Sequence, residues 1–352
     1  MARAPKPVEF EEDEDLPVRA NPDLLGHLNA AAALEAAARS GRLPHAWLVC
    51  GPPGIGKATL AYRFGRWLLA GGPDQPPAPG AAPLALDPAH PVFRRIAAGS
   101  HADLRALRPE AATGVTKAIR VDDVRAAIRF LAMTPAEGAW RFVLVDRAET
   151  MRPEAANALL KTLEEPPPRA VLMLTTAAPD RLLPTIRSRC RRLDLGPLTP
   201  ADTATLLQRL RPDLPKAERE RLAQVAEGSP GRALELLEGE GLAIQALVDR
   251  VLAALPEGNR RDWHAIAEAV AQKRDGSGFT TFMALLRREI SAAVRGAAQA
   301  RTPPPWLAGR SLAEWSTLWD SLGRLAAETD GLSLDRKGAV LTALGWLSPP
   351  RR

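Results

Sequence analysis

The chain has 352 residues, of which 46% are hydrophobic and 25% are charged, and its formal net charge is +6. This length favours two or three domains, and the composition is that of an ordinary globular protein. No stretch approaches the run of about 18 apolar residues that a membrane helix needs, and two cysteines are too few for a disulfide framework or a four-cysteine zinc site. A cytoplasmic location is expected, and the positive charge permits contact with nucleic acid without requiring it.

The N-terminal region carries an acidic run and lacks the apolar core of a signal peptide. Residues 1–20 are therefore expected to form a disordered acidic tail, with a docking segment for a partner as the alternative. An alanine-rich helix is predicted over 28–40, where Gly41 ends it. Residues 45–50 then form a short apolar strand.

The next segment joins a helix to a region without visible periodicity. The helix is predicted over 58–70. Residues 71–91 are rich in Pro, Gly and Ala and are expected to form a mobile insertion. A short strand is predicted over 119–121, and Asp122 is expected to cap the helix that follows.

Strands and helices alternate through the remainder of the first half. Apolar strands are expected over 140–145, 170–176 and 192–195, with a helix over 153–163. This alternation predicts an α/β domain over 21–197, built on a parallel sheet that helices cover on both faces.

Beyond residue 197 the periodicity is helical. A small helical lid is predicted over 198–242, and an all-α collar that joins other subunits is predicted over 243–352. Four tryptophans are expected in the core of this collar: Trp306, Trp315, Trp319 and Trp346.

A glycine-rich loop follows the first apolar strand and opens a helix. It reads GPPGIGK from Gly51 to Lys57, and this context is typical of a phosphate-binding P-loop. Gly51, Gly54 and Gly56 let backbone N–H groups turn toward phosphate oxygens, and the Lys57 ammonium reaches the terminal phosphates. The alternative is an ordinary turn between a strand and a helix.

The groups that hydrolysis needs are incomplete. A P-loop places Ser or Thr directly after the Lys to hold Mg²⁺. This chain has Ala58 there and then Thr59. Thr59 points elsewhere on the helix and is placed for an inner phosphate. Asp146 ends its strand as a Walker B carboxylate should, but Arg147 follows it where motors of this class carry a water-activating Glu. Glu149 lies two residues further on, and nothing in the pattern assigns it that role. Binding of ATP with Mg²⁺ stays open, and little or no hydrolysis is expected.

Two further motifs carry a resemblance to a known family. Residues 157–167 read NALLKTLEEPP and residues 185–190 read TIRSRC, both downstream of the P-loop and Asp146. In this order they resemble the signatures of bacterial clamp-loader subunits of the AAA+ class, over roughly residues 20–240. The resemblance implies that Arg189 is an arginine finger acting in trans, and that Thr176, with Thr175 as the other candidate, is sensor 1. The plain alternatives are a surface arginine at a strand edge and two threonines favoured by β-structure.

Within that family the chain resembles the delta-prime branch more than the tau/gamma motor. Ala58 and Arg147 favour this reading, as does Gly231, which stands where the motor has a sensor 2 Arg. Arg232 is one position off. Residues 71–91 contain none of the four cysteines of the family's zinc module, so no zinc is expected.

The resemblance implies a stator subunit of the DNA polymerase III holoenzyme. Such a subunit belongs to a hetero-oligomer with tau/gamma and delta subunits, and the assembly loads the sliding clamp onto primed DNA. The main alternative is an active clamp-loader ATPase of tau/gamma type. A nucleotide kinase and a clamp-loader-like scaffold outside replication are further alternatives, although a kinase does not account for both motifs together.

Overall fold

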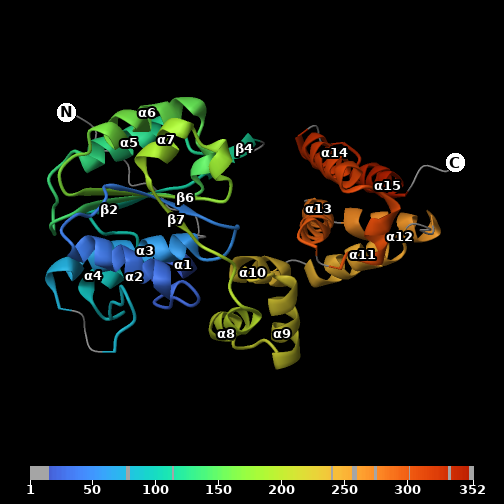
Figure 1. Ribbon diagram of the computed structural model, residues 1–352, viewed down its shortest axis with the longest axis horizontal. Helices are drawn as coiled ribbons and strands as arrows, with labels where there is room; N and C mark the ends of the chain where they lie inside the picture. Colours follow the sequence, from blue (N-terminus) through green and yellow to red (C-terminus); the bar gives the residue numbers. More distant parts are fainter. Residues whose placement is uncertain are drawn as a thin grey trace, which may run out of the picture. The chain divides into compact units, whose positions relative to one another are not determined.

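Figure 1 shows the computed structural model, which describes residues 16–76, 80–112, 115–238, 241–255, 260–272, 276–300, 302–331 and 334–348. The chain forms two compact units, Met1–Ala233 and Leu234–Arg352. The α/β P-loop fold followed by helices, which the sequence predicts, is confirmed. The finer division into three domains stays a prediction. No helix within the described ranges has both the length and the hydropathy required to span a bilayer.

A five-stranded sheet forms the centre of the first unit. Its strand order is β2-β5-β6-β1-β7, and every neighbouring pair is parallel. The register pairs Cys50 with Thr176 on one side and with Asp194 on the other. The strands are β1 (Ala46–Cys50), β2 (Leu104–Leu107), β5 (Arg141–Val145), β6 (Ala170–Thr176) and β7 (Arg191–Asp194), while β3 (Glu110–Ala112) and β4 (Val115–Ala118) form a separate antiparallel pair.

Successive residues of the three central strands, β5, β6 and β1, point into two different hydrophobic cores, one on each face of the sheet. In β1, Trp47 and Val49 belong to the core beneath one set of helices, and Leu48 and Cys50 belong to the other. The two sets of helices lie on opposite faces of the sheet in Figure 1. The first set comprises α1 (Leu16–Ala20), α2 (Leu28–Arg39), α3 (Lys57–Leu69) and α4 (Pro91–Ala97), and the second comprises α5 (Val121–Leu131), α6 (Pro153–Glu164) and α7 (Pro184–Arg189).

The predicted acidic tail falls mostly outside the described residues. Its last five residues, Leu16–Ala20, form a helix instead of a disordered segment. The reason lies in a buried arginine, Arg66, which donates to the Arg19 carbonyl at 2.6 Å and to the Asn21 carbonyl at 2.7 Å. Burial lowers the pKa of Arg66 to about 10, and a buried cation needs such acceptors. The segment is therefore held on the core by α3.

The predicted strand over 119–121 and the predicted cap at Asp122 are wrong. Helix α5 begins at Val121 with Arg120 as its N-cap, so Asp122 already lies in the first turn. The Asp123 carboxylate accepts the backbone N–H of Arg120 at 3.3 Å. The acid that closes this helix start therefore lies one residue beyond the one that the sequence favours.

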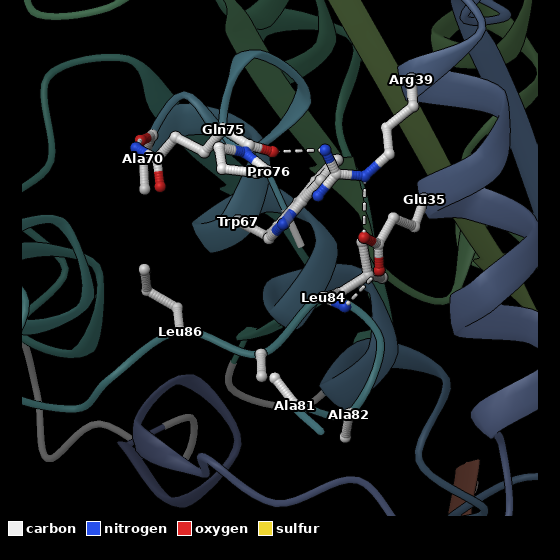
Figure 2. A pocket seen from close by; sticks show the side chains of 12 residues that line it. Glu35, Arg39, Trp67, Ala70, Gln75, Pro76, Ala81, Ala82, Leu84 and Leu86 are labelled. Atoms are coloured by element: carbon white, nitrogen blue, oxygen red, sulfur yellow. Dashed lines mark hydrogen bonds and ion pairs between the residues drawn. The ribbon is translucent and has the colours of Figure 1, made fainter. Parts of the chain in front are cut away.

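The insertion over 71–91 is packed on the first unit, although a mobile loop is expected from its composition. Figure 2 shows Arg39 beside Glu35 and Gln75. These three residues are part of the lining of a cavity of about 110 Å³. Arg39 donates to the Glu35 carboxylate at 2.9 Å and to the Gln75 carbonyl, and Glu35 accepts the Leu84 N–H at 3.0 Å. Leu84 is 1% exposed. Three residues of the insertion, 77–79, lie outside the described ranges.

Helices make up the remainder of the chain. Of the four tryptophans expected in the core, Trp315 is buried and donates to the Leu307 carbonyl at 2.9 Å, but Trp346 is 40% exposed, so the expectation is wrong there. The α-helices are α8 (Pro200–Leu210), α9 (Lys216–Val225), α10 (Pro230–Glu238), α11 (Gly241–Ala253), α12 (Arg260–Ala271), α13 (Ser277–Ala298), α14 (Leu312–Gly331) and α15 (Arg336–Leu347).

Candidate functional site

The glycine-rich loop leaves the carboxyl end of β1 and leads into α3. Gly51, Gly54 and Gly56 have φ values of +154°, +71° and +100°, which are conformations that side chains disfavour. The Gly51 N–H donates to the Thr176 carbonyl at 3.2 Å. The loop therefore lies at the edge of the sheet where parallel α/β folds bind ligands.

Lys57 folds back onto its own loop. Its ammonium donates to the Gly51 carbonyl at 2.9 Å and to the Pro52 carbonyl at 2.6 Å, and the residue is 8% exposed. Burial lowers the pKa of Lys57, against the opposite influence of the Glu149 and Asp146 carboxylates. The cation thus already has partners within the chain.

The next three carbonyls of the loop also accept hydrogen bonds. The Ser229 hydroxyl donates to Pro53 at 2.9 Å, and His27 Nε2 donates to Ile55 at 2.7 Å. The backbone N–H of Gly231 donates to Gly54 at 2.9 Å. The loop is tied to α10 on one side and to the start of α2 on the other. Burial lowers the pKa of His27, against the influence of its bond to Ile55.

The contact between the loop and α10 is made by backbone. A Cβ atom on Gly231 would lie 2.9 Å from the Cα of Gly54, and one on Gly54 would lie 2.4 Å from the Ser229 hydroxyl. Real Cβ contacts are longer, so each position requires glycine for this approach. The first turn of α10 therefore packs directly on the glycine-rich loop.

Asp146 follows β5 at the same edge of the sheet, and a threonine of β6 holds it. The Thr175 hydroxyl donates to the Asp146 carboxylate and accepts the Arg147 N–H at 3.0 Å. Thr176 accepts the Ala178 N–H at 3.1 Å instead. Neighbouring strand residues point to opposite faces, so the structure gives the Walker B contact to Thr175 and not to Thr176, the first choice for sensor 1.

Glu149 is the acidic residue that the sequence pattern left without a role. Arg147 adopts a left-handed conformation with φ of +57°, and a short 3₁₀ turn over 148–150 follows it. One oxygen of Glu149 accepts the Ala177 N–H at 3.3 Å, and the other is buried without a hydrogen-bond partner among the described residues. Of the carboxylates that influence the Lys57 pKa, Glu149 has the largest effect. The sequence pattern assigned Glu149 no role because it does not directly follow Asp146.

The site suits a phosphate better than a metal ion. The loop, the α3 N-terminus and Lys57 are those of a phosphate cradle. Ala58 has no side-chain oxygen, however, and one carboxylate oxygen of Asp146 accepts a hydrogen bond from the Thr175 hydroxyl. Within the described ranges, no group of three or more His, Cys, Asp or Glu side chains is arranged to hold a metal ion. The loop and Lys57 thus have the arrangement of a phosphate cradle, whereas residue 58 supplies no side-chain hydroxyl for a metal ion.

Arg189 lies at the opposite edge of the sheet. Arg189 is the last residue of α7, and β7 begins two residues later, paired with Trp47 of β1. The phosphate loop, in contrast, leaves β1 after Cys50. Three residue steps along a strand place the two edges roughly 10 Å apart or more. Arg189 donates to Glu164 at 2.6 Å and to the Thr185 carbonyl at 3.0 Å, and its side chain is 34% exposed. It is a helix-end arginine with a partly exposed side chain, remote from this chain's own glycine-rich loop.

Comparison with known proteins bears first on the central part of the first unit. A family model described as DNA polymerase III, delta subunit, matches residues 26–199. The delta' subunit of Pseudomonas aeruginosa is 42% identical over 203 residues, which cover 57% of this chain and 58% of that protein. The delta' subunit of Escherichia coli is 32% identical over 267 residues, which cover 74% of this chain and 75% of that protein. The chain belongs to the DNA polymerase III delta-prime subunit family.

The tau subunit of Escherichia coli is similar over a smaller share of its length. It is 30% identical over 244 residues, which cover 67% of this chain and 36% of that protein. Among solved structures, a gamma subunit-related protein of Thermotoga maritima has a TM-score of 0.47 at 20% identity, covering 89% of this chain and 98% of that one. The resemblance in sequence thus extends over a larger share of the Escherichia coli delta-prime subunit than of its tau subunit.

Proposed function

We propose that this delta-prime family member acts as a stator in a clamp loader and supplies Arg189 in trans to ATP held by a neighbouring subunit. The assembly would contain tau/gamma and delta subunits and would load a sliding clamp onto primed DNA, in the cytoplasm. The observation that carries the proposal is the separation of the two edges of the sheet. The accessible guanidinium lies at one edge, and the chain's own phosphate loop lies at the other.

The phosphate edge supports a role without turnover. Lys57 bonds to the carbonyls of its own loop, Ala58 replaces the metal-binding hydroxyl, and Arg147 replaces the water-activating acid. Metal placement and water activation supply much of phosphoryl-transfer catalysis. The chain's own groups at this edge would hold a nucleotide without advancing its hydrolysis.

The arginine edge supports action on a neighbour. Arginine presents five N–H donors in a planar fork that matches phosphate oxygens. Where such an arginine is supplied in trans, it stabilises the charge that develops on the transferred phosphoryl group. Arg189 retains 34% exposure beside its partner Glu164, so a neighbouring ATP has access to it.

The test is ATP-dependent clamp loading by the complex reconstituted from this chain and its cognate partners, with Arg189→Ala in place of the natural chain. We expect a loss of about tenfold or more, because an arginine finger supplied in trans is worth about 10³ or more in single-site systems. Arg187→Ala is the matched control, since Arg187 lies on the same helix and pairs with Asp180 at 2.8 Å. Equal activity of the two variants would refute the arginine-finger role.

The isolated chain provides the second test. Titration with a fluorescent ATP analogue, with phosphate release followed in the same samples, should show binding without Mg²⁺-dependent turnover. Robust turnover that Lys57→Ala abolishes would instead favour an active ATPase of tau/gamma type.

A further inference from the structure

We propose that Glu164 is a positioning residue for Arg189, holding the guanidinium in the orientation in which it meets a neighbour's phosphate. This inference rests on the proposed arginine-finger role. Glu164 is the last residue of α6, within the NALLKTLEEPP motif, and Arg189 is the last residue of α7, within the TIRSRC motif. The two motifs meet in this pair of side chains.

The geometry restrains the guanidinium at two points. One terminal nitrogen of Arg189 donates to the Glu164 carboxylate at 2.6 Å, and the other donates to the Thr185 carbonyl at 3.0 Å. The nitrogen that bonds to Thr185 also donates to the Ser188 hydroxyl, in a longer bond of 3.5 Å. Each terminal nitrogen carries two N–H groups and Nε carries one, so these three bonds still leave donors for a ligand. The side chain is therefore held in one orientation and still has N–H donors available to a ligand.

The carboxylate itself is on a fixed support. The Leu163 carbonyl, one residue before Glu164, accepts a hydrogen bond at 3.0 Å from Nε2 of His45, which precedes β1. Leu163 is 2% exposed and belongs to the core between α6 and the sheet. The end of α6 is therefore anchored to the same edge of the sheet as Arg189.

Two opposing effects follow from this arrangement. An arginine without such a bond loses rotamer freedom when it is immobilised at an interface. The bond to Glu164 already restricts the rotamers of Arg189 before binding, so less conformational entropy is lost on binding. The negative charge of Glu164 also weakens the pull of Arg189 on a phosphate. Both groups are partly exposed, with side-chain exposures of 34% and 51%, so water and salt screen that charge. Positioning is then the larger effect.

The experiment compares Glu164→Ala, Glu164→Gln and Glu165→Ala in the reconstituted loader, with ATP-dependent clamp loading as the readout. Glu165 is the next residue and is exposed. We expect Glu164→Ala to lower activity about twofold to tenfold, the range for losing one pre-ordered side chain. Glu164→Gln keeps an oxygen acceptor and should stay within about twofold of the natural chain, as should Glu165→Ala.

A double variant separates positioning from a structural effect. Glu164→Ala should have no further consequence in an Arg189→Ala background, because Glu164 acts only through Arg189. The positioning role is overturned if Glu164→Ala equals Glu165→Ala, or if its loss persists in full without Arg189. If Arg189→Ala alone has no effect, the proposed function fails instead, which is a distinguishable result.

Discussion

The two edges of the central sheet differ in how their polar groups are used. At the carboxyl edge, the carbonyls of residues 51–55 accept hydrogen bonds from Lys57, Ser229, Gly231 and His27. At the amino edge, Arg189 keeps an accessible guanidinium on a short helix. The same α/β scaffold thus has a glycine-rich loop that is fixed to the start of α10 at one edge and a partly exposed arginine at the other.

The largest expected effect concerns Cys190, the residue after Arg189. Its reactivity tests whether solvent reaches the chain beside Arg189 as well as Arg189 itself. Cys190 is 8% exposed, and burial raises its pKa from 9.0 to about 12. At pH 8 the thiolate fraction should fall about 10³-fold relative to the unfolded chain. Alkylation by iodoacetamide, quantified by mass spectrometry with and without denaturant, measures this protection.

The raised pKa of Cys190 also has a pH dependence of definite sign. The folded chain favours the neutral thiol, so this contribution to stability is complete below about pH 9 and is lost as the pH rises from 9 toward 12. Equal alkylation rates in folded and unfolded chains would mean that this edge opens well beyond Arg189.

Gly231→Ala tests the contact between the start of α10 and the glycine-rich loop. The added methyl would meet the Gly54 backbone at 2.9 Å, and overpacking of this kind costs about 1–3 kcal/mol. Hydrogen exchange of peptides from the loop and α10 should accelerate accordingly. Gly345→Ala is the control, because no atom lies within 4 Å of its added Cβ. It should stabilise α15 by about 0.5–1 kcal/mol, and the same sign for both variants would argue against this contact.

Ser229→Ala removes a smaller part of the same contact. The hydroxyl donates to Pro53 and accepts the Arg232 N–H at 3.3 Å, and the residue is 5% exposed. Its loss should cost about 1 kcal/mol, measured by the same exchange experiment. Thr205→Ala, which removes an exposed hydroxyl on α8, should change the exchange of the loop hardly at all. Similar effects of the two variants would show that Ser229 does not stabilise the contact between the loop and α10.

Arg187→Ala is expected to have the smallest effect. Arg187 forms an exposed ion pair with Asp180 at 2.8 Å, and such pairs contribute about 0.2–1 kcal/mol. Thermal unfolding should shift by only a few degrees or less. A larger shift would mean that α7 depends on this pair, and Arg187 would then be a poor control for Arg189.

The sequence predicts the parallel sheet, the P-loop and the positions of Asp146 and Arg189 because each rests on local periodicity or a motif. It does not place Glu149 near Lys57, because that proximity depends on the left-handed turn at Arg147. The choice between Thr175 and Thr176 depends on which strand face meets Asp146. A strand that is buried on both faces has no alternation of apolar and polar residues to reveal it. Contacts between distant segments, such as Gly231 with Gly54, leave no local signal at all.

The approach of Gly231 to Gly54 has a consequence for the thermodynamics of ligand binding. A helix that a bound ligand must order loses conformational freedom at that moment, and the loss weakens the interaction. Here the start of α10 is ordered against the loop by hydrogen bonds within the chain. The entropy of ordering this segment is therefore already lost during folding, whether or not a ligand is present.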